Sequence, residues 1–181
     1  MVTFQSPDDP VALAVDLANT WDTLEPDPEL LRDVASLKRF LTRQGYGTAP
    51  RVTARDLDRV RSVRDSLRAA FAAAHEEHAV EELNRILGRT GAKPQLTRQG
   101  GDWRLEWVGG IADALAATTA MSLLEAIRDD GWERFGMCAG APCCCVFVDR
   151  SKNRTRRFCC SLCADRVAQS LYRARRRSGA E

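Results

Sequence analysis

The chain has 181 residues, of which 44% are hydrophobic and 29% are charged, a composition typical of a soluble globular protein. It contains no apolar run of about 18 residues, which argues against a membrane-spanning helix. Its first ten residues are acidic and lack an apolar stretch, so we expect no signal peptide, no membrane partner and a cytoplasmic location.

The net charge of +2 is unevenly distributed. Residues 149–181 hold ten Lys and Arg against three Asp and Glu, whereas the preceding 148 residues hold 17 against 22. A mildly acidic body therefore carries a strongly basic C-terminal end. This asymmetry indicates a polyanionic partner, with nucleic acid as the first candidate, although a solvated arginine-rich tail would have the same composition.

The N-terminal part has a mainly helical pattern. Residues 11–19 form a short apolar run that suits either a strand or a short helix. A clearer helix is predicted with Asp27 as its cap, and Gly45 is expected to end it. Residues 46–52 then read as a linker.

Two more helices and a hairpin are predicted next. Thr53 can cap a long helix that we expect to end near His78, and residues 80–88 repeat the helical spacing. Apolar residues then alternate on both sides of Gly100–Gly101, which predicts a β-hairpin. The tryptophans of this hairpin, Trp103 and Trp107, are expected in the core.

Residues 111–131 are small and apolar throughout, which predicts a buried helix. After this helix the character of the chain changes, because all seven cysteines lie between Cys138 and Cys163. In a reducing compartment such a cluster is more consistent with metal binding than with disulfides.

The cysteine spacing is typical of a structural zinc site, which needs four ligands that usually arrive as two close pairs. The first pair is Cys138 and Cys143, and the second is either Cys159 or Cys160 together with Cys163. A module of this size buries little apolar surface, so bound metal would supply much of its folding energy. The segment after the last cysteine is expected to form a basic helix.

Two alternatives to zinc remain open at this point. An iron–sulfur cluster also uses four thiolates, although its motifs usually group three cysteines tightly with one distant. A redox switch could use the spare thiols Cys144, Cys145 and Cys160, because neighbouring arginines lower a thiol pKa.

The segment from Cys138 to the final arginines resembles the CGNR-type zinc finger. The residues that match its pattern are Cys138, Cys143, Phe147, Asp149, Ser151, Asn153, Arg156, Arg157, Phe158, Cys159, Cys163 and Arg166. The name-giving C-G-N-R reads C-A-D-R in this chain, at residues 163–166. The resemblance implies one structural Zn²⁺ on Cys138, Cys143, Cys159 and Cys163, and it favours Cys159 over Cys160.

The stretch LAVDLANT, residues 13–20, is similar to the opening of the domain that precedes this finger in bacterial proteins described as stress-induced transcription regulators. This resemblance implies DNA rather than RNA as the partner, which the residues alone do not decide. We therefore expect a mostly α, α+β protein. Residues 1–132 would form a helical domain with a β-hairpin, and residues 133–181 a zinc-ribbon or treble-clef-like module ending in a basic helix.

The arginines of the C-terminal module are the candidate nucleic-acid contacts. They are Arg154, Arg156, Arg157, Arg166, Arg173, Arg175, Arg176 and Arg177. In the body, Asp16, Asn19 and Thr20 end an apolar run and could line a pocket for a small-molecule effector, or simply form a turn and a helix cap. Arg64 could pair with Asp16 there or lie on the surface.

The function that these features favour is a zinc-binding, nucleic-acid-binding transcription regulator, with a homodimer as one arrangement. The alternative is a thiol-sensing or protein-interaction module that does not bind nucleic acid. No nucleophile elbow, phosphate-binding glycine loop or His-Glu-x-x-His helix occurs in the sequence, so we expect no enzymatic activity.

Overall fold

The computed structural model describes residues 2–4, 9–46 and 51–178. The helices in these residues are α1 (Pro10–Ala18), α2 (Val34–Arg43), α3 (Ala54–Phe71), α4 (Glu76–Arg89), α5 (Ile111–Asp130), the 3-10 helix η1 (Trp132–Arg134) and α6 (Ser161–Ser178). The strands are β1 (Val2–Phe4), β2 (Lys93–Gln99), β3 (Asp102–Gly109), β4 (Phe135–Met137) and β5 (Val146–Val148). The mostly helical α+β class is confirmed.

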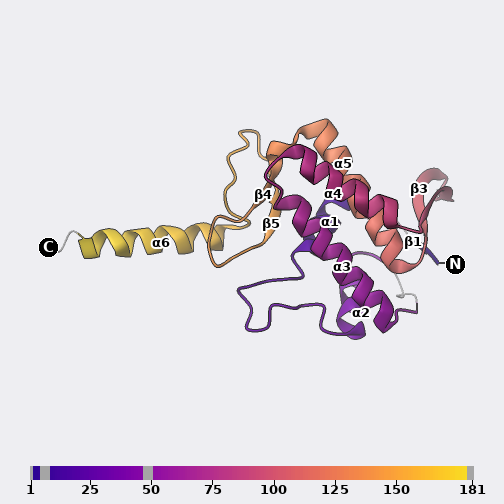
Figure 1. Cartoon of the computed structure of the whole chain (residues 1–181), viewed down its shortest axis with the longest axis horizontal. Helices are drawn as coiled ribbons and strands as arrows, with labels where there is room; N and C mark the ends of the chain where they lie inside the picture. The colour runs from indigo at the N-terminus through magenta and orange to yellow at the C-terminus, as the bar shows by residue number, and fades with distance from the viewer. Residues whose placement is uncertain (1, 5–8, 47–50, 179–181) are drawn as a thin grey trace.

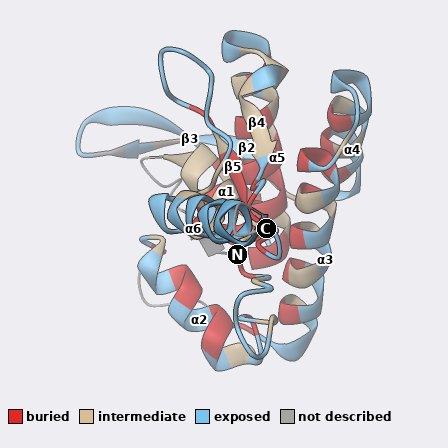
Figure 2. Ribbon diagram, turned by 90° about the vertical axis from the view of Figure 1, so that its left-hand side faces the viewer, coloured by how far each residue is buried: buried red, intermediate tan, exposed pale blue. Residues whose placement is uncertain are grey.

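Helix α5 lies at the centre of the fold, and α1, α3 and α4 pack against it (Figure 1). Its sequence is small and apolar on nearly every side, and twelve of its 20 residues are buried. Figure 2 shows much of this helix in the colour of buried residues. Because a helix that is apolar all round has no face suited to water, the central position follows from the sequence.

The first two helices begin at aspartates. In α1, the Asp9 carboxylate accepts a hydrogen bond from the Ala12 N–H at 2.9 Å, so residues 11–19 form a helix and not a strand. Helix α2 begins after Asp33, which forms a capping box with Ser36. The predicted cap at Asp27 is wrong, because two-way capping at Asp33 satisfies more of the free helix N–H groups. The predicted linker lies mainly in 47–50, outside the described residues.

The next two helices are separate elements. Thr53 caps α3 as predicted, but α3 ends at Phe71 instead of near His78. Helix α4 then begins at Glu76, earlier than the predicted residue 80. Two glutamates in its first turn favour a helix N-terminus there, because their charge complements the helix dipole.

A three-stranded antiparallel sheet covers one end of the bundle, in the order β1–β3–β2. The predicted hairpin is present, with Gly100 and Gly101 at φ of +59° and +100° in its turn. Trp107 packs against the core, but Trp103 is 66% exposed, so its predicted core position is wrong. The hairpin extends beyond the helices, as its exposed outer part in Figure 2 shows.

The C-terminal module is built from the β4–β5 hairpin and α6. The hairpin packs against the body, because Val146 is part of the main hydrophobic core and Phe135 and Val148 lie against it. Gly136 is required in β4, since a Cβ there would lie 2.7 Å from the Phe147 ring. Figure 1 shows α6 projecting away from the helical body. No helix among the described residues is long and apolar enough to cross a membrane.

Candidate metal centre and basic helix

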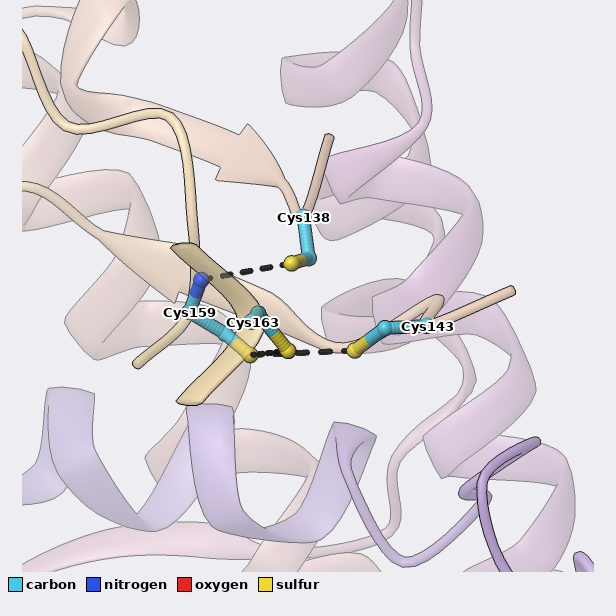
Figure 3. Close-up of side chains that lie close together, drawn as sticks. All are labelled: Cys138, Cys143, Cys159 and Cys163. Atoms are coloured by element: carbon cyan, nitrogen blue, oxygen red, sulfur yellow. Dashed lines mark hydrogen bonds between the residues drawn. The ribbon is translucent and has the colours of Figure 1, made fainter. Parts of the chain in front are cut away.

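Four cysteines from three parts of the C-terminal module converge on one point (Figure 3). Cys138 directly follows β4, and Cys143 lies in the loop that leads to β5. Cys159 lies near the end of the long loop after β5, and Cys163 lies in the first turn of α6. A hairpin thus provides one pair and the start of a helix contributes to the other, as in the treble-clef-like module predicted from the sequence.

The geometry of this cluster suits zinc. All four Sγ atoms lie within 4.8 Å of one another. The Sγ atom of Cys159 lies 3.7 Å from that of Cys143 and 3.6 Å from that of Cys163. Four thiolates at about 2.3 Å from a tetrahedral zinc ion stand about 3.8 Å apart, so one structural zinc ion fits this donor set.

Most of the cluster is shielded from solvent, and a backbone N–H contacts one of its sulfurs. Cys138, Cys143 and Cys163 are buried, and Phe158 packs against them. The N–H of Cys159 donates to the Cys138 sulfur at 3.4 Å, a contact typical of cysteines that carry negative charge in metal sites. These contacts hold the four sulfurs close together and facing one point.

The thiol pKa values follow from burial and crowding. Burial raises the pKa of Cys138, but hydrogen bonds from the N–H groups of Cys159 and Gly140 outweigh it and lower this pKa to about 7. Burial raises the pKa of Cys163 to about 12 and that of Cys159 well above its usual range. Zinc binding to these four cysteines therefore releases protons.

Asp149 closes the loop that connects the two ligand pairs. Its carboxylate accepts hydrogen bonds from the N–H groups of Ser151 and Arg156, each at 2.8 Å. Hydrogen bonding from the Ser151 side chain and from the Arg156 N–H holds the pKa of Asp149 below its usual 3.8. These contacts give the buried Asp149 a structural role, because its side chain builds the turn between the two ligand pairs.

Three cysteines lie outside the cluster. Cys144 is half-buried and accepts from the Thr23 hydroxyl at 3.4 Å. Cys145 is half-buried beside the cluster, and burial raises its pKa to about 12. Cys160 is exposed, with its Sγ atom 3.9 Å from that of Cys159.

Three of the eight candidate arginines hold the module together. Arg154 pairs with Glu133, and Arg156 donates to the carbonyl of Cys159. Arg166 donates to the carbonyl of Gly140 at 2.5 Å, which ties the start of α6 to the first ligand loop. The guanidinium groups of these three arginines are thus used within the protein.

The other five candidate arginines are exposed. They are Arg157, Arg173, Arg175, Arg176 and Arg177. Four of them lie in the outer half of α6, where every described side chain from Ala168 to Arg177 is exposed. The structure therefore separates a structural set of arginines at the base of the module from an outward-facing set on its helix.

Comparison with protein families bears on the whole chain. A family model named ABATE, described as "Putative stress-induced transcription regulator", matches residues 11–130. The chain belongs to this family. The CGNR zinc finger matches residues 134–176, so both predicted resemblances are confirmed. A comparison with curated proteins found no match.

The ABATE part holds the finger through α1 and α3. The Asn19 side chain accepts from the Val146 N–H at 2.7 Å and donates to the Val146 carbonyl at 3.0 Å. It thus takes the place of a neighbouring strand beside β5. From α3, Arg68 donates to the Cys144 carbonyl at 3.1 Å and to the Ala18 carbonyl at 3.0 Å.

Three of the four predicted pocket residues line one hollow of about 410 Å³ beside α2, namely Asp16, Asn19 and Thr20. Their polar groups are used within the protein. Thr20 donates to the Leu17 carbonyl at 2.7 Å, and Asp16 accepts from Gln44 at 2.8 Å. Together with the contacts of Asn19 to β5, this favours the turn-and-cap role over an effector site.

Arg64 lies elsewhere than predicted. It is 3% exposed and pairs with Glu29 at 2.6 Å, so it neither reaches Asp16 nor lies on the surface. Its guanidinium carbon also lies 5.5 Å from the centre of the Trp21 ring. Sequence reasoning missed this partner because residues 19–33 form a long loop whose path has no periodic signal.

Proposed function

We propose that this protein is a zinc-dependent transcription regulator that binds nucleic acid, preferably DNA, through helix α6. The observation that carries the proposal is the outward face of this helix. It projects from the body and bears Arg173, Arg176 and Arg177, none of which forms an ion pair with a described residue. Under this proposal the protein acts by binding and not as an enzyme.

Electrostatics supports this assignment. The body carries more acidic than basic groups, so the C-terminal module that includes α6 is the part of the chain that suits a polyanion. The guanidinium of Arg176 lies 5.8 Å from the centre of the exposed Tyr172 ring, which leaves both groups at the helix surface. Arginines on a rigid helix can contact successive phosphates. Other exposed side chains on the same face of α6 would reach base edges.

Zinc has a positioning role in this proposal. Cys163 lies in the first turn of α6, and Arg166 ties the next turn to the loop that carries Cys138 and Cys143. Metal binding would fix the direction in which α6 leaves the body. Loss of zinc would leave the arginines present but no longer held in one orientation, so binding should weaken without a change in charge.

The experiment is a salt series of binding to a random-sequence DNA duplex and to single-stranded RNA. Each arginine that neutralises a phosphate should add about 0.9 to the slope of log affinity against log salt for B-DNA. We expect the triple variant Arg173→Gln, Arg176→Gln, Arg177→Gln to have a shallower slope. The difference should correspond to the loss of up to three phosphate contacts. The homodimer stays a prediction. Sedimentation of the complex would test it by showing whether one or two chains bind a duplex.

The matched control changes three exposed arginines of the body, Arg39, Arg43 and Arg55, to glutamine. It makes the same change in net charge in the acidic part of the chain. Equal effects of the two triple variants, or no binding of the wild type to either nucleic acid at low salt, would refute α6 as the contact element. A cytoplasmic location also remains a prediction.

One observation favours the alternative thiol-sensing function. Cys160 is exposed, and its sulfur lies 3.9 Å from that of Cys159, so an oxidised Cys160 could form a disulfide with Cys159. Hydrogen peroxide should then release zinc from the wild type faster than from Cys160→Ser. Equal release rates would leave Cys160 without a sensing role.

A further inference from the structure

A second hollow, far in the sequence from the finger, lies between α3, α4 and the start of α5. Its volume is about 200 Å³. It shares no lining residue with the hollow beside α2 or with the metal centre. Its chemistry differs from both.

The lining of this hollow includes apolar side chains from all three helices. Val63 comes from α3, Ile86 from α4, and Ala112 and Ala116 from α5. Ile86, Ala112 and Ala116 are buried and Val63 is partly buried. The small alanines leave the space that larger side chains would fill, so an apolar group of a few carbon atoms can lie between these helices.

The charged residues around the hollow have a net charge, because three arginines face two acidic residues. Arg59 pairs with Asp113 at 2.5 Å, and Arg85 pairs with Glu82. Burial raises the pKa of Asp113, but the hydrogen bonds from Arg59 and from the Gly91 N–H, with the charge of Arg59, outweigh it and hold this pKa below 3.8, so the carboxylate is charged at neutral pH. The third arginine, Arg89, remains and gives the hollow one net positive charge.

Three polar side chains around this hollow have no partner in the described part of the chain. The guanidinium of Arg89 and the hydroxyls of Ser62 and Ser66 make no hydrogen bond or ion pair with another described side chain or backbone group. This contrasts with the hollow beside α2, where Asp16, Asn19 and Thr20 are all hydrogen-bonded within the protein. Arg89 and Ser62 are exposed and Ser66 is half-buried, so a ligand in the hollow could reach these donors. An apolar hollow with a few polar groups around it is the usual form of a small-molecule site.

We propose that this hollow binds a small organic monocarboxylate. The planar guanidinium of Arg89 would hold the carboxylate, since its paired N–H groups match the two carboxylate oxygens. The serine hydroxyls would donate to the same group, and the short apolar tail would lie against Val63 and Ile86. The single unbalanced positive charge selects a monoanion over a dianion such as a phosphate monoester.

This inference does not depend on nucleic-acid binding by α6. The hollow is built from the ABATE part of the chain alone, and the finger contributes no lining residue. A test on the zinc-loaded full-length chain can therefore succeed whether or not the protein binds nucleic acid. Ligand binding is also separable from zinc content, which is measured on the same sample.

The experiment is calorimetric titration of the zinc-loaded full-length protein with hexanoate and with benzoate. Hexanamide and benzamide are the matched neutral probes, because they keep the shape and remove the charge. We expect the carboxylates to bind and the amides to bind at least about tenfold more weakly, the factor typical of a hydrogen bond to a charged group. Inorganic phosphate is the probe for a simple anion site.

Three variants locate the site. Arg89→Gln should weaken carboxylate binding by about tenfold or more, whereas Arg55→Gln, an exposed arginine of α3 outside the hollow, should leave it unchanged. Val63→Phe should fill the hollow and abolish binding, with unchanged circular dichroism as the check that the protein folds. The proposal is overturned if neither carboxylate binds at millimolar concentration, if phosphate binds as well as they do, or if Arg89→Gln behaves like Arg55→Gln.

Discussion

Replacement of Asn19 by alanine tests whether this side chain holds the finger or serves a ligand. The two hydrogen bonds between Asn19 and the backbone of Val146 contribute about 1 kcal/mol each. Val146 is 1% exposed, so its N–H and carbonyl would lose their partners in a buried place, which costs about 1 to 3 kcal/mol for each group that water cannot reach. We expect Asn19→Ala to lower the free energy of unfolding by about 2 to 4 kcal/mol.

The measurement is urea unfolding of the zinc-loaded protein, followed by circular dichroism. Gln44→Ala is the matched control, because it removes an amide whose hydrogen bond to Asp16 lies at the exposed surface. We expect the control to change the free energy of unfolding by less than about 0.5 kcal/mol. If Asn19→Ala also changed it by less than that, the reasoning would be refuted, and Asn19 would be available for the effector role considered from the sequence.

Three further predictions concern the metal, a buried tyrosine and a glycine. Cys163→Ser should abolish zinc binding measured by atomic absorption, whereas Cys160→Ser should retain one zinc per chain. Burial raises the pKa of Tyr46 above its usual 10.0. Above about pH 10 Tyr46 therefore ionises in the unfolded chain but not in the folded one, so the protein should lose stability as the pH rises. The tyrosinate absorbance of Tyr46 should appear only on unfolding. Gly136→Ala should destabilise the protein by about 1 to 3 kcal/mol through the clash with the Phe147 ring. Gly88→Ala, in an open part of α4, should stabilise it by about 0.5 to 1 kcal/mol in the same unfolding assay.

The metal centre is the part that the sequence predicts best. Two cysteine pairs and the loop between them form a local pattern, and Asp149 closes this loop with contacts to residues two and seven positions away. The spacing of the cysteines does not by itself decide whether Cys159 or Cys160 is the zinc ligand. The structure places the Cys159 sulfur inside the cluster and leaves Cys160 exposed at the start of α6.

Features that depend on distant neighbours were harder to predict. The alternating pattern correctly places Trp103 and Trp107 on one face of the hairpin. It does not predict which part of the hairpin the helices cover, and Trp103 lies beyond that part. Asp27 and Asp33 are both acceptable caps locally, and the capping box with Ser36 decides between them. The strand-like role of Asn19 joins residues 127 positions apart, so no local pattern reports it.

The shared core of body and finger limits how such proteins could be recombined. The two family matches meet near residues 131–133, which suggests a convenient place to exchange one finger for another. Val146 nevertheless packs into the core of the body, where Asn19 holds its own N–H and carbonyl and Arg68 holds the carbonyl of Cys144. A chimera joined at this junction would keep a stable body only if the incoming finger presented the same backbone path and a side chain of similar size at 146.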